Sequence, residues 1–367
     1  RTPWPRPRPN NGPGGPGTPS PRVTGGPHRQ VGPAFLSLDS FGWNLLHRRK
    51  GHCIMLHELP CYQGVDLRGP CACFTAASPS TVREALLTLG LSKASVGRLF
   101  AAQKVRASMD GPVLRPSDVL EVSSPFLVSL GCGDPWRAVG THGALPLPSV
   151  LYEDDFLLAL DKPAPLLVHG DGTGAPTLTD LAARYLVGAP IPQALQRLDV
   201  DTTGVVLFSK LPEFQSAFDA LVSGGSIEKR YLAVVKGAFP KGKTLIDDSL
   251  GRDRHDARRM RVAPQGGQPS RTWVECLAVA HDNSASLVSA VLETGRRHQI
   301  RVHLASRGHP VMNDPLYGNG EGRSGALMLH AYRERFRHPV TGAVVDVATG
   351  WPERFSSWFD PIDAAAF

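Results

Sequence analysis

The sequence predicts an α+β fold for residues 150–367, with a largely antiparallel mixed sheet and flanking helices. Short β-branched or apolar runs bounded by turn residues dominate this part of the chain, and helical stretches are interspersed among them. The sequence shows no regular alternation of strands and helices and no Gly-x-Gly-x-x-Gly segment after a strand. These observations argue against a doubly wound nucleotide-binding sheet.

Seven segments of this region carry clear signals for strands or helices. Strands are predicted at Phe156–Leu160, Val205–Ser209, Tyr231–Val235, Trp273–Ala280 and Leu287–Leu292. A helix is predicted over Pro212–Val222, because proline is tolerated at a first helical position and Ser-Gly-Gly follows. A second helix is predicted over Arg297–Ser306, which Gly308 and Pro310 close.

The chain ahead of residue 150 divides into four parts. Residues 1–33 contain ten prolines and five arginines but no Asp, Glu or Lys, so we expect a disordered tail. Residues 34–78 show no clear period and stay unassigned, and residues 126–149 are expected to be a linker. Residues 79–125 form a candidate domain between them.

The candidate domain at residues 79–125 is expected to hold two helices and a small hairpin. Thr81 and Glu84 form a capping-box pattern at the start of the first helix, and the second helix is expected near Ser95–Gln103. Short strands are expected on both sides of the Asp110-Gly111 turn. This pattern resembles the alpha-L RNA-binding domain, and a small helical adapter is the alternative.

Composition limits the class of protein. With 367 residues, 41% of them apolar and 20% charged, the chain is expected to be globular, and no apolar run reaches the roughly 18 residues of a membrane span. A net charge of +7 permits a polyanionic partner. Six cysteines without a Cys-x-x-Cys pair indicate a reducing compartment and no metal site. The arginine-rich, acid-poor tail favours a mitochondrial location, with a flexible linker or basic arm as the alternative.

The most informative motif is Gln196-Arg-Leu-Asp-Val-Asp-Thr-Thr-Gly204, which leads directly into a predicted strand. A loop rich in Asp and Thr before a strand can hold a carboxylate at a cleft, although an isolated motif of this kind also fits a solvated turn. Three further segments follow it, at residues 228–237, 294–305 and 308–318. Together the four segments resemble the RluA family of RNA pseudouridine synthases, as do Lys162-Pro163 and Val168-His169.

This resemblance implies the pseudouridine synthase fold, with a central RNA-binding cleft, and an isomerase that needs no cofactor. The expected substrate is uridine in structured RNA, foremost large-subunit ribosomal RNA or a pre-ribosomal particle. Ribosomal or assembly proteins are further expected partners, through the N-terminal extension. A second interpretation stays open, in which the chain is an RNA-binding ribosome-assembly factor that keeps the fold without turnover.

The resemblance also implies roles for three residues. Asp199 matches the catalytic aspartate, which suits a carboxylate that acts as nucleophile and leaving group. Arg301 matches the arginine that pairs with it, and a surface arginine is the alternative. Tyr231 matches the tyrosine that stacks on the uracil and assists removal of the carbon 5 proton, and a strand core residue is the alternative.

RNA binding is expected from residues around these three. By the same resemblance, Arg197 is the candidate to fill the gap that a flipped uridine leaves in its stack. Five arginines between Arg252 and Arg261 suggest a phosphate-binding strip, with a solvated charged loop as the alternative. The complete set of predicted RNA-binding residues is Arg197, Lys229, Arg252, Arg254, Arg258, Arg259, Arg296 and His298.

The chain departs from the family pattern at four positions. Gln196 stands where His is usual, and Thr203 stands where Ser is usual. Arg297 replaces a small polar residue, and Asn313 replaces a common Gly before Asp314. None of these changes removes the expected nucleophile, but Arg297 and Asn313 are expected to reshape the RNA groove.

Overall fold

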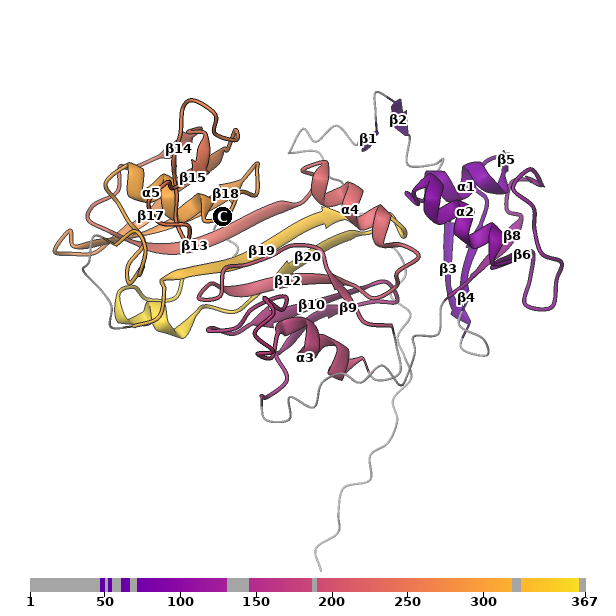
Figure 1. Ribbon diagram of the computed structural model, residues 1–367, viewed down its shortest axis with the longest axis horizontal. Coiled ribbons are helices and arrows are strands. Elements are labelled where there is room, and N and C mark those ends of the chain that lie inside the picture. The colour runs from indigo at the N-terminus through magenta and orange to yellow at the C-terminus, as the bar shows by residue number, and fades with distance from the viewer. Residues whose placement is uncertain are drawn as a thin grey trace, which may run out of the picture. The chain divides into compact units, whose positions relative to one another are not determined.

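The computed structural model describes residues 71–130, 145–186, 190–318 and 325–362 (Figure 1). It also gives the backbone of three strands, β1 (His47–Arg49), β2 (His52–Ile54) and β3 (Cys61–Asp66). The predicted tail at residues 1–33 lies outside the described residues, as do most of the unassigned segment and of the linker. Within the described part of the chain, no helix is long and apolar enough to cross a membrane.

The N-terminal domain combines a small antiparallel sheet with two helices. Its strands lie in the order β3-β4-β8-β6, and β5 pairs with β7. The elements after β3 are β4 (Cys71–Thr75), β5 (Ser80–Thr81), α1 (Val82–Thr88), α2 (Lys93–Ala101), β6 (Val105–Arg106), β7 (Val119–Leu120) and β8 (Pro125–Ser129). The sheet reaches past both ends of residues 79–125 because β4 pairs with β8 along its length. Its identity as an alpha-L domain stays a prediction.

The predicted capping box at the start of α1 is confirmed. The Thr81 hydroxyl accepts a hydrogen bond from the Glu84 backbone N–H, and the Glu84 carboxylate accepts one from the Thr81 N–H at 2.9 Å. Both partners therefore satisfy backbone groups that the first helical turn leaves unpaired.

The C-terminal domain is built on one ten-stranded sheet. The strand order is β14-β17-β18-β13-β19-β12-β10-β9, with β11 on β12 and β20 on β19. Its strands are β9 (Val150–Glu153), β10 (Leu157–Lys162), β11 (Gln193–Ala194), β12 (Thr203–Ser209), β13 (Glu228–Lys236), β14 (Lys243–Ile246), β17 (Thr272–Val279), β18 (Ala285–Leu292), β19 (Leu329–Arg337) and β20 (Val344–Ala348). Within this sheet β12 and β19 run parallel, and the other pairings are antiparallel. The predicted largely antiparallel mixed sheet is confirmed.

Helices cover both faces of this sheet. Leu158 and Leu160 of β10 pack in the same apolar cluster as α3 (Leu178–Tyr185), whereas Leu157 and Ala159 pack with α4 (Gln215–Ser223). Successive side chains of a strand point to opposite faces, so a continuous apolar run is what a strand buried on both sides requires. The remaining elements are a hairpin of β15 (Leu250–Arg252) and β16 (Met260–Val262), helix α5 (Gln299–Ser306) and the 3-10 turn Glu353–Ser357.

The two predicted helices of this domain exist but begin later than expected. Helix α4 starts at Gln215, because the backbone around Pro212 first forms turns, with Phe214 N–H donating to Leu211 O. Helix α5 starts at Gln299 because His298 has a φ of 54°, in the left-handed region. A right-handed helix cannot continue through a residue in that conformation.

The parallel contact between β12 and β19 requires glycine at position 204. Gly204 has a φ of +115°, and its Cα register partner is Ala331. A Cβ atom there would lie 2.1 Å from the Ala331 carbonyl oxygen, which belongs to the backbone and cannot rotate away. The close approach of the two strands therefore fixes the end of the loop that precedes β12.

We expect Gly204→Ala to lower the free energy of unfolding by at least about 2 kcal/mol, because backbone strain and a steric clash add together. Gly242→Ala is the matched control, since Gly242 has a φ of +90° with no other described atom within 4 Å of the added Cβ. The control should lose only the cost of the left-handed conformation, about 1 kcal/mol. Chemical denaturation measures both, and equal losses would refute the clash.

Candidate functional site

A large open cleft lies beside β13, between the loop that precedes β12 and the segment that follows β18. Its volume is about 1660 Å³, beyond the roughly 1000 Å³ of common small-molecule pockets. Asp199, Tyr231 and Arg301 all line it, although they come from a loop, a strand and a helix far apart in the sequence. The three residues that the sequence predicted to act together therefore share one site, and their roles stay predictions.

Arg301 links two carboxylates at the centre of the cleft. Its Nη1 donates to Asp199 Oδ2 at 2.8 Å, while Nε and Nη2 donate to the two oxygens of Asp314 at 2.7 and 2.8 Å. The Arg301 side chain is only 3% exposed, which excludes the alternative of a surface arginine. Burial opposes the charge of Arg301, but the hydrogen bonds and charges of Asp314 and Asp199 outweigh it and raise the pKa of the guanidinium.

The geometry at Asp199 gives its two oxygens different surroundings. Oδ2 accepts the Arg301 hydrogen bond, whereas Oδ1 lies 3.7 Å from Nε2 of His298. The Asp199 side chain is 24% exposed, in contrast to the completely buried side chain of Asp314. Arg301 thus orients Asp199 at the surface of the cleft while Asp314 holds Arg301 from behind.

A buried lysine fixes the backbone just after Asp199. The Nζ of Lys162 donates to the carbonyl oxygens of Pro163, Leu166 and Val200 at 3.1, 2.7 and 2.9 Å. The Leu166 N–H also donates to Val200 O. Burial lowers the pKa of Lys162 to about 8, and the charges of Asp201 and Asp199 oppose this effect. Lys162 therefore remains mainly protonated at neutral pH, with three N–H groups for three carbonyls.

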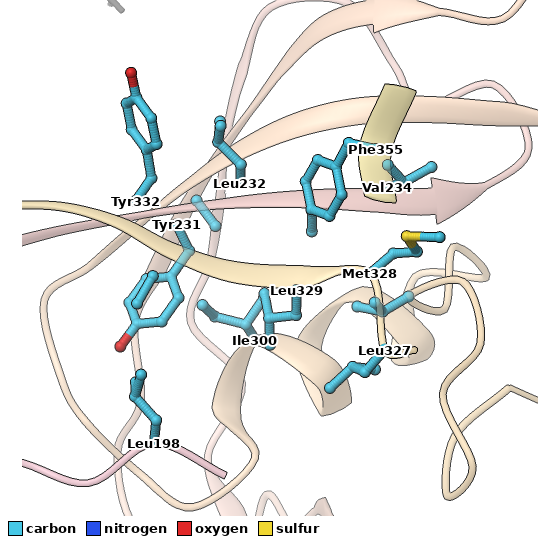
Figure 2. Packing of buried hydrophobic residues seen from close by; sticks show 14 of the residues in the cluster. Leu198, Tyr231, Leu232, Val234, Ile300, Leu327, Met328, Leu329, Tyr332 and Phe355 are labelled. Carbon is cyan, nitrogen blue, oxygen red and sulfur yellow. The ribbon is translucent and has the colours of Figure 1, made fainter. Parts of the chain in front are cut away.

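Tyr231 points from β13 toward the loop that carries Asp199. Figure 2 shows its ring directed at Leu198, on the side opposite to the ring of Tyr332. The side chain is 7% exposed and lines the cleft. Burial raises the pKa of Tyr231, and the negative charges of Glu334 and Asp199 raise it further. The phenol group is therefore protonated at neutral pH, and the residue belongs to both the core and the cleft.

Gln299 organises the segment that leads into α5. Its Oε1 accepts hydrogen bonds from Thr294 Oγ1 and Arg296 N, at 2.9 and 3.0 Å. Its Nε2 donates to Arg271 O and Thr272 Oγ1 at similar distances. Because the side chain is 2% exposed, these four bonds satisfy a buried amide completely and fix the first turn of the helix that carries Arg301.

His298 is held in one tautomer by Tyr317. The Tyr317 hydroxyl accepts from the Met260 N–H at 2.8 Å, so its proton is available for Nδ1 of His298, also at 2.8 Å. When Nδ1 accepts this hydrogen bond, the single N–H proton of the neutral ring lies on Nε2, which faces Asp199. Burial is the main cause that lowers the pKa of His298, so the ring is neutral at neutral pH. The Tyr317 ring also contacts the guanidinium groups of Arg259 and Arg301.

The predicted RNA-binding residues divide into two groups. Five of them line the cleft together with the three candidate catalytic residues, namely Arg197, Lys229, Arg258, Arg296 and His298. Arg252, Arg254 and Arg259 lie outside its lining and are exposed on the hairpin and its tip. Arg258 also pairs with Asp256 at 2.7 Å. The hairpin therefore presents only part of the predicted strip to the cleft.

The departures from the family pattern fit the local geometry. Asn313 has a φ of 59°, a conformation that Gly adopts freely and that Asn tolerates better than most residues. Arg297 donates to the backbone oxygens of Ala257 and Arg258, which ties the cleft to the tip of the arginine-rich hairpin. Gln196 donates to Glu334. None of these contacts interrupts the pair of Asp199 and Arg301.

Three residues with evident roles in this geometry were not among the predicted site residues. Asp314 and Lys162 lie in segments that carry the family resemblance, so those segments were the available signal. Glu334 carries no local signal, because a single charged residue in a strand normally faces water. In the described part of the chain, no group of three or more His, Cys, Asp or Glu side chains could hold a metal ion.

We expect Asp314→Asn to lower the free energy of unfolding by about 3 kcal/mol, because it weakens a buried pair and leaves Arg301 poorly compensated. The control is Asp248→Asn, whose partner Arg307 at the end of α5 has a 45% exposed side chain. Loss of that pair should cost less than about 1 kcal/mol. Denaturant titration compares the two variants, and similar losses would contradict the different burial of the pairs.

Comparison with known proteins gives one consistent family. A family profile described as RNA pseudouridylate synthase matches residues 156–306. The uncharacterised RNA pseudouridine synthase YhcT of Bacillus subtilis is 35% identical over 207 residues, which cover 55% of this chain and 68% of that protein. The ribosomal large subunit pseudouridine synthase D of Xanthomonas campestris is 34% identical over 270 residues, with 67% and 78% covered. For the enzyme of the same name from Neisseria meningitidis serogroup A, the match covers 58% of its length.

A solved structure agrees with this assignment at the level of the fold. The structure of human RNA pseudouridylate synthase domain containing 1 matches with a TM-score of 0.51 at 24% identity, and covers 60% of this chain and 91% of that one. The likeness extends the sequence match to the sheet and helices described above. With the relatives of Bacillus and Xanthomonas matched over more than two thirds of their length, the chain belongs to the RNA pseudouridine synthase family, whose members are isomerases.

Proposed function

We propose that this chain isomerises uridine to pseudouridine in structured RNA, foremost in large-subunit ribosomal RNA, with Asp199 as the catalytic carboxylate. The observation that carries the proposal is the hydrogen bond of 2.8 Å between Arg301 and Asp199 inside the cleft. Relatives named for the large ribosomal subunit support the class of RNA. The substrate and the roles of the residues are proposals that the experiments below test.

The reaction needs a carboxylate and a positive partner but no redox step. The bond between the ribose and uracil N1 breaks, the ring turns, and a bond forms from the ribose to C5. The C5 proton leaves and N1 gains a proton, so atoms and electrons balance within the nucleotide and solvent. Arg301 orients Asp199 through one oxygen, which leaves the other oxygen for the nucleotide.

Tyr231 then serves the uracil mainly as a stacking surface. Its raised pKa keeps the hydroxyl protonated at neutral pH, so deprotonation of Tyr231 to a phenolate base would cost a large free energy. An aromatic ring in the cleft wall offers a flat apolar surface to a base that has left its stack. The hydroxyl group can still donate a hydrogen bond.

Arginines around the cleft supply the RNA contacts. Arg197 is exposed and lies two residues before Asp199, which suits a side chain that fills the gap left by a flipped nucleotide. Lys229, Arg258, Arg296 and His298 line the same cleft and offer donors to phosphate oxygens. Arg252, Arg254 and Arg259 would bind phosphates farther from the reacting base.

Two finer assignments are also proposals. A mitochondrial location is supported by the arginine-rich, acid-poor composition of residues 1–33, and fractionation of cells that express the full chain tests it. Contacts of the N-terminal extension with a pre-ribosomal particle are supported by the same positive charge. Equal particle affinity with and without residues 1–33 would exclude that role.

Asp199→Asn should abolish release of tritium from large-subunit ribosomal RNA labelled at uracil C5, while RNA affinity stays within about tenfold. The substitution removes the nucleophile but keeps the shape and the phosphate contacts. Asp201→Asn is the control, because Asp201 lies on the same loop and should retain turnover. Turnover by Asp199→Asn would refute the assignment.

The assembly-factor alternative predicts the opposite result in cells. Turnover is dispensable if two results hold in cells that lack the protein. No pseudouridine is lost in these cells, and Asp199→Asn rescues their growth and ribosome assembly as well as the wild type does. Loss of mapped pseudouridines that only the wild type restores supports the enzyme.

Arg301→Lys should reduce turnover strongly even at saturating RNA, because lysine keeps the charge but cannot form the two-sided pair with Asp199 and Asp314. The measurement is kcat for tritium release, together with RNA affinity. Wild-type kcat would show that Arg301 does not orient the nucleophile.

A further inference from the structure

A buried glutamate lies beneath the catalytic loop on the same face of the sheet as Tyr231. Glu334 of β19 is 1% exposed, and its Cα register partner across the sheet is Lys229 of β13. Lys229 and Tyr231 are two residues apart and so point to one face. Their partners Glu334 and Ala331 are three residues apart, because a β-bulge shifts the register between them. The bulge thus turns Glu334 toward the face that carries the cleft.

Glu334 contacts the residue that stands three positions before Asp199. The Nε2 of Gln196 donates to Oε1 of Glu334. Among the described residues, neither Oε2 of Glu334 nor Oε1 of Gln196 has a hydrogen-bond partner, although both atoms are buried. A buried oxygen without a partner is costly, and two such oxygens lie here on side chains already joined by one hydrogen bond.

One proton satisfies both oxygens. A neutral carboxyl group carries an O–H donor, and a side-chain amide offers N–H donors beside a carbonyl oxygen that accepts. If Glu334 is protonated at Oε2, it donates to Oε1 of Gln196 while Oε1 of Glu334 still accepts from Nε2. The two side chains then form a cyclic acid–amide pair with two hydrogen bonds.

The pair of Glu334 and Gln196 lies before Asp199 in the chain, and the backbone after Asp199 is already fixed. Lys162 and Leu166 bind the carbonyl oxygen of Val200, directly after Asp199. Gln196 lies on the preceding side, where Arg197 is exposed. The contact between Gln196 and Glu334 therefore holds the N-terminal end of the short segment that carries Arg197 and Asp199, and the contacts of Val200 hold its C-terminal end.

We propose that Glu334 is a positioning residue for the loop that carries Asp199. With its carboxyl group protonated, Glu334 holds Gln196 through two hydrogen bonds between acid and amide. When ionised, it keeps one hydrogen bond from Gln196 and is attracted to Lys229 instead. The pairing itself is a property of the fold, and its effect on turnover rests on the proposed function.

The charges around Glu334 set the pH range of this change. Lys229 and Tyr231 face it from β13, Gln196 from the loop, and apolar Val347 is its partner on β20. Burial raises the pKa of Glu334 to about 7, while Lys229 and the Gln196 hydrogen bond act against this. The folded chain thus holds a proton that the unfolded chain releases near pH 4.5. This contribution to stability is complete below that value and is lost as pH rises through about 7.

Hydrogen exchange of the loop tests the pairing without any assumption about RNA. In the wild-type chain of 367 residues, protection factors for residues 195–202 should fall as pH rises through about 7. Glu334→Gln, which pairs as a permanently neutral amide, should keep the high protection at every pH. Glu334→Leu, which has a similar volume and no polar atom, should show low protection at every pH.

Glu228→Gln is the matched control, because Glu228 lies on β13 and pairs with Arg230 of the same strand at 3.2 Å rather than with the loop. It should retain the wild-type pH dependence. Persistent pH dependence in Glu334→Gln, or wild-type protection in Glu334→Leu, would overturn the proposal.

Kinetics separate a positioning role from a merely structural one. Glu334→Leu should lower kcat by about tenfold or more and leave the KM for RNA within about threefold, because it loosens the loop without removing phosphate contacts. Glu334→Gln should restore kcat and remove the ionisation near pH 7 from its profile. An unchanged kcat profile in Glu334→Gln rejects the effect on turnover. Absence of wild-type turnover on every RNA instead rejects the proposed function, and the exchange data still decide the pairing.

Discussion

A buried guanidinium between two carboxylates is the interaction on which the site depends. Arg301 cannot be left uncompensated at 3% exposure, so Asp314 neutralises it from inside and Asp199 from the cleft. The arrangement joins helix α5 to two loops that the sequence separates widely. Gln299 at the start of α5, which uses all its hydrogen-bonding groups, keeps this arginine in place.

Around this centre, the loop that carries Asp199 is fixed by groups that never reach the cleft surface. Lys162 binds the carbonyl that follows Asp199, and the close approach of Gly204 to Ala331 fixes the entry into β12. The departures from the family pattern obey the same constraints. Asn313 adopts a left-handed conformation next to Asp314, and Gln196 finds its partner in Glu334.

The arginines of the site differ in exposure and in their partners. Arg197, Arg252, Arg254 and Arg259 are exposed, whereas the buried Arg301 donates its hydrogen bonds to two carboxylates. Arg297 donates to backbone oxygens at the tip of the arginine-rich hairpin. The Tyr317 ring contacts both Arg259 of that hairpin and the buried Arg301. Arg297 and Tyr317 therefore join the arginine-rich hairpin to the residues around Arg301.

The sequence by itself predicted five of the ten strands in the large sheet, the capping box at Thr81 and the family motifs around Asp199, because apolar runs and turn residues act locally. Helix starts were less accurate, since no residue pattern announced the left-handed conformation of His298 that delays α5. Only the tertiary structure revealed Asp314 as the inner partner of Arg301 and Glu334 as the partner of Gln196, which is 138 residues away. A bulge in one strand turns Glu334 toward the cleft, and the neighbouring strand sets the register of that bulge. No local pattern encodes such a contact.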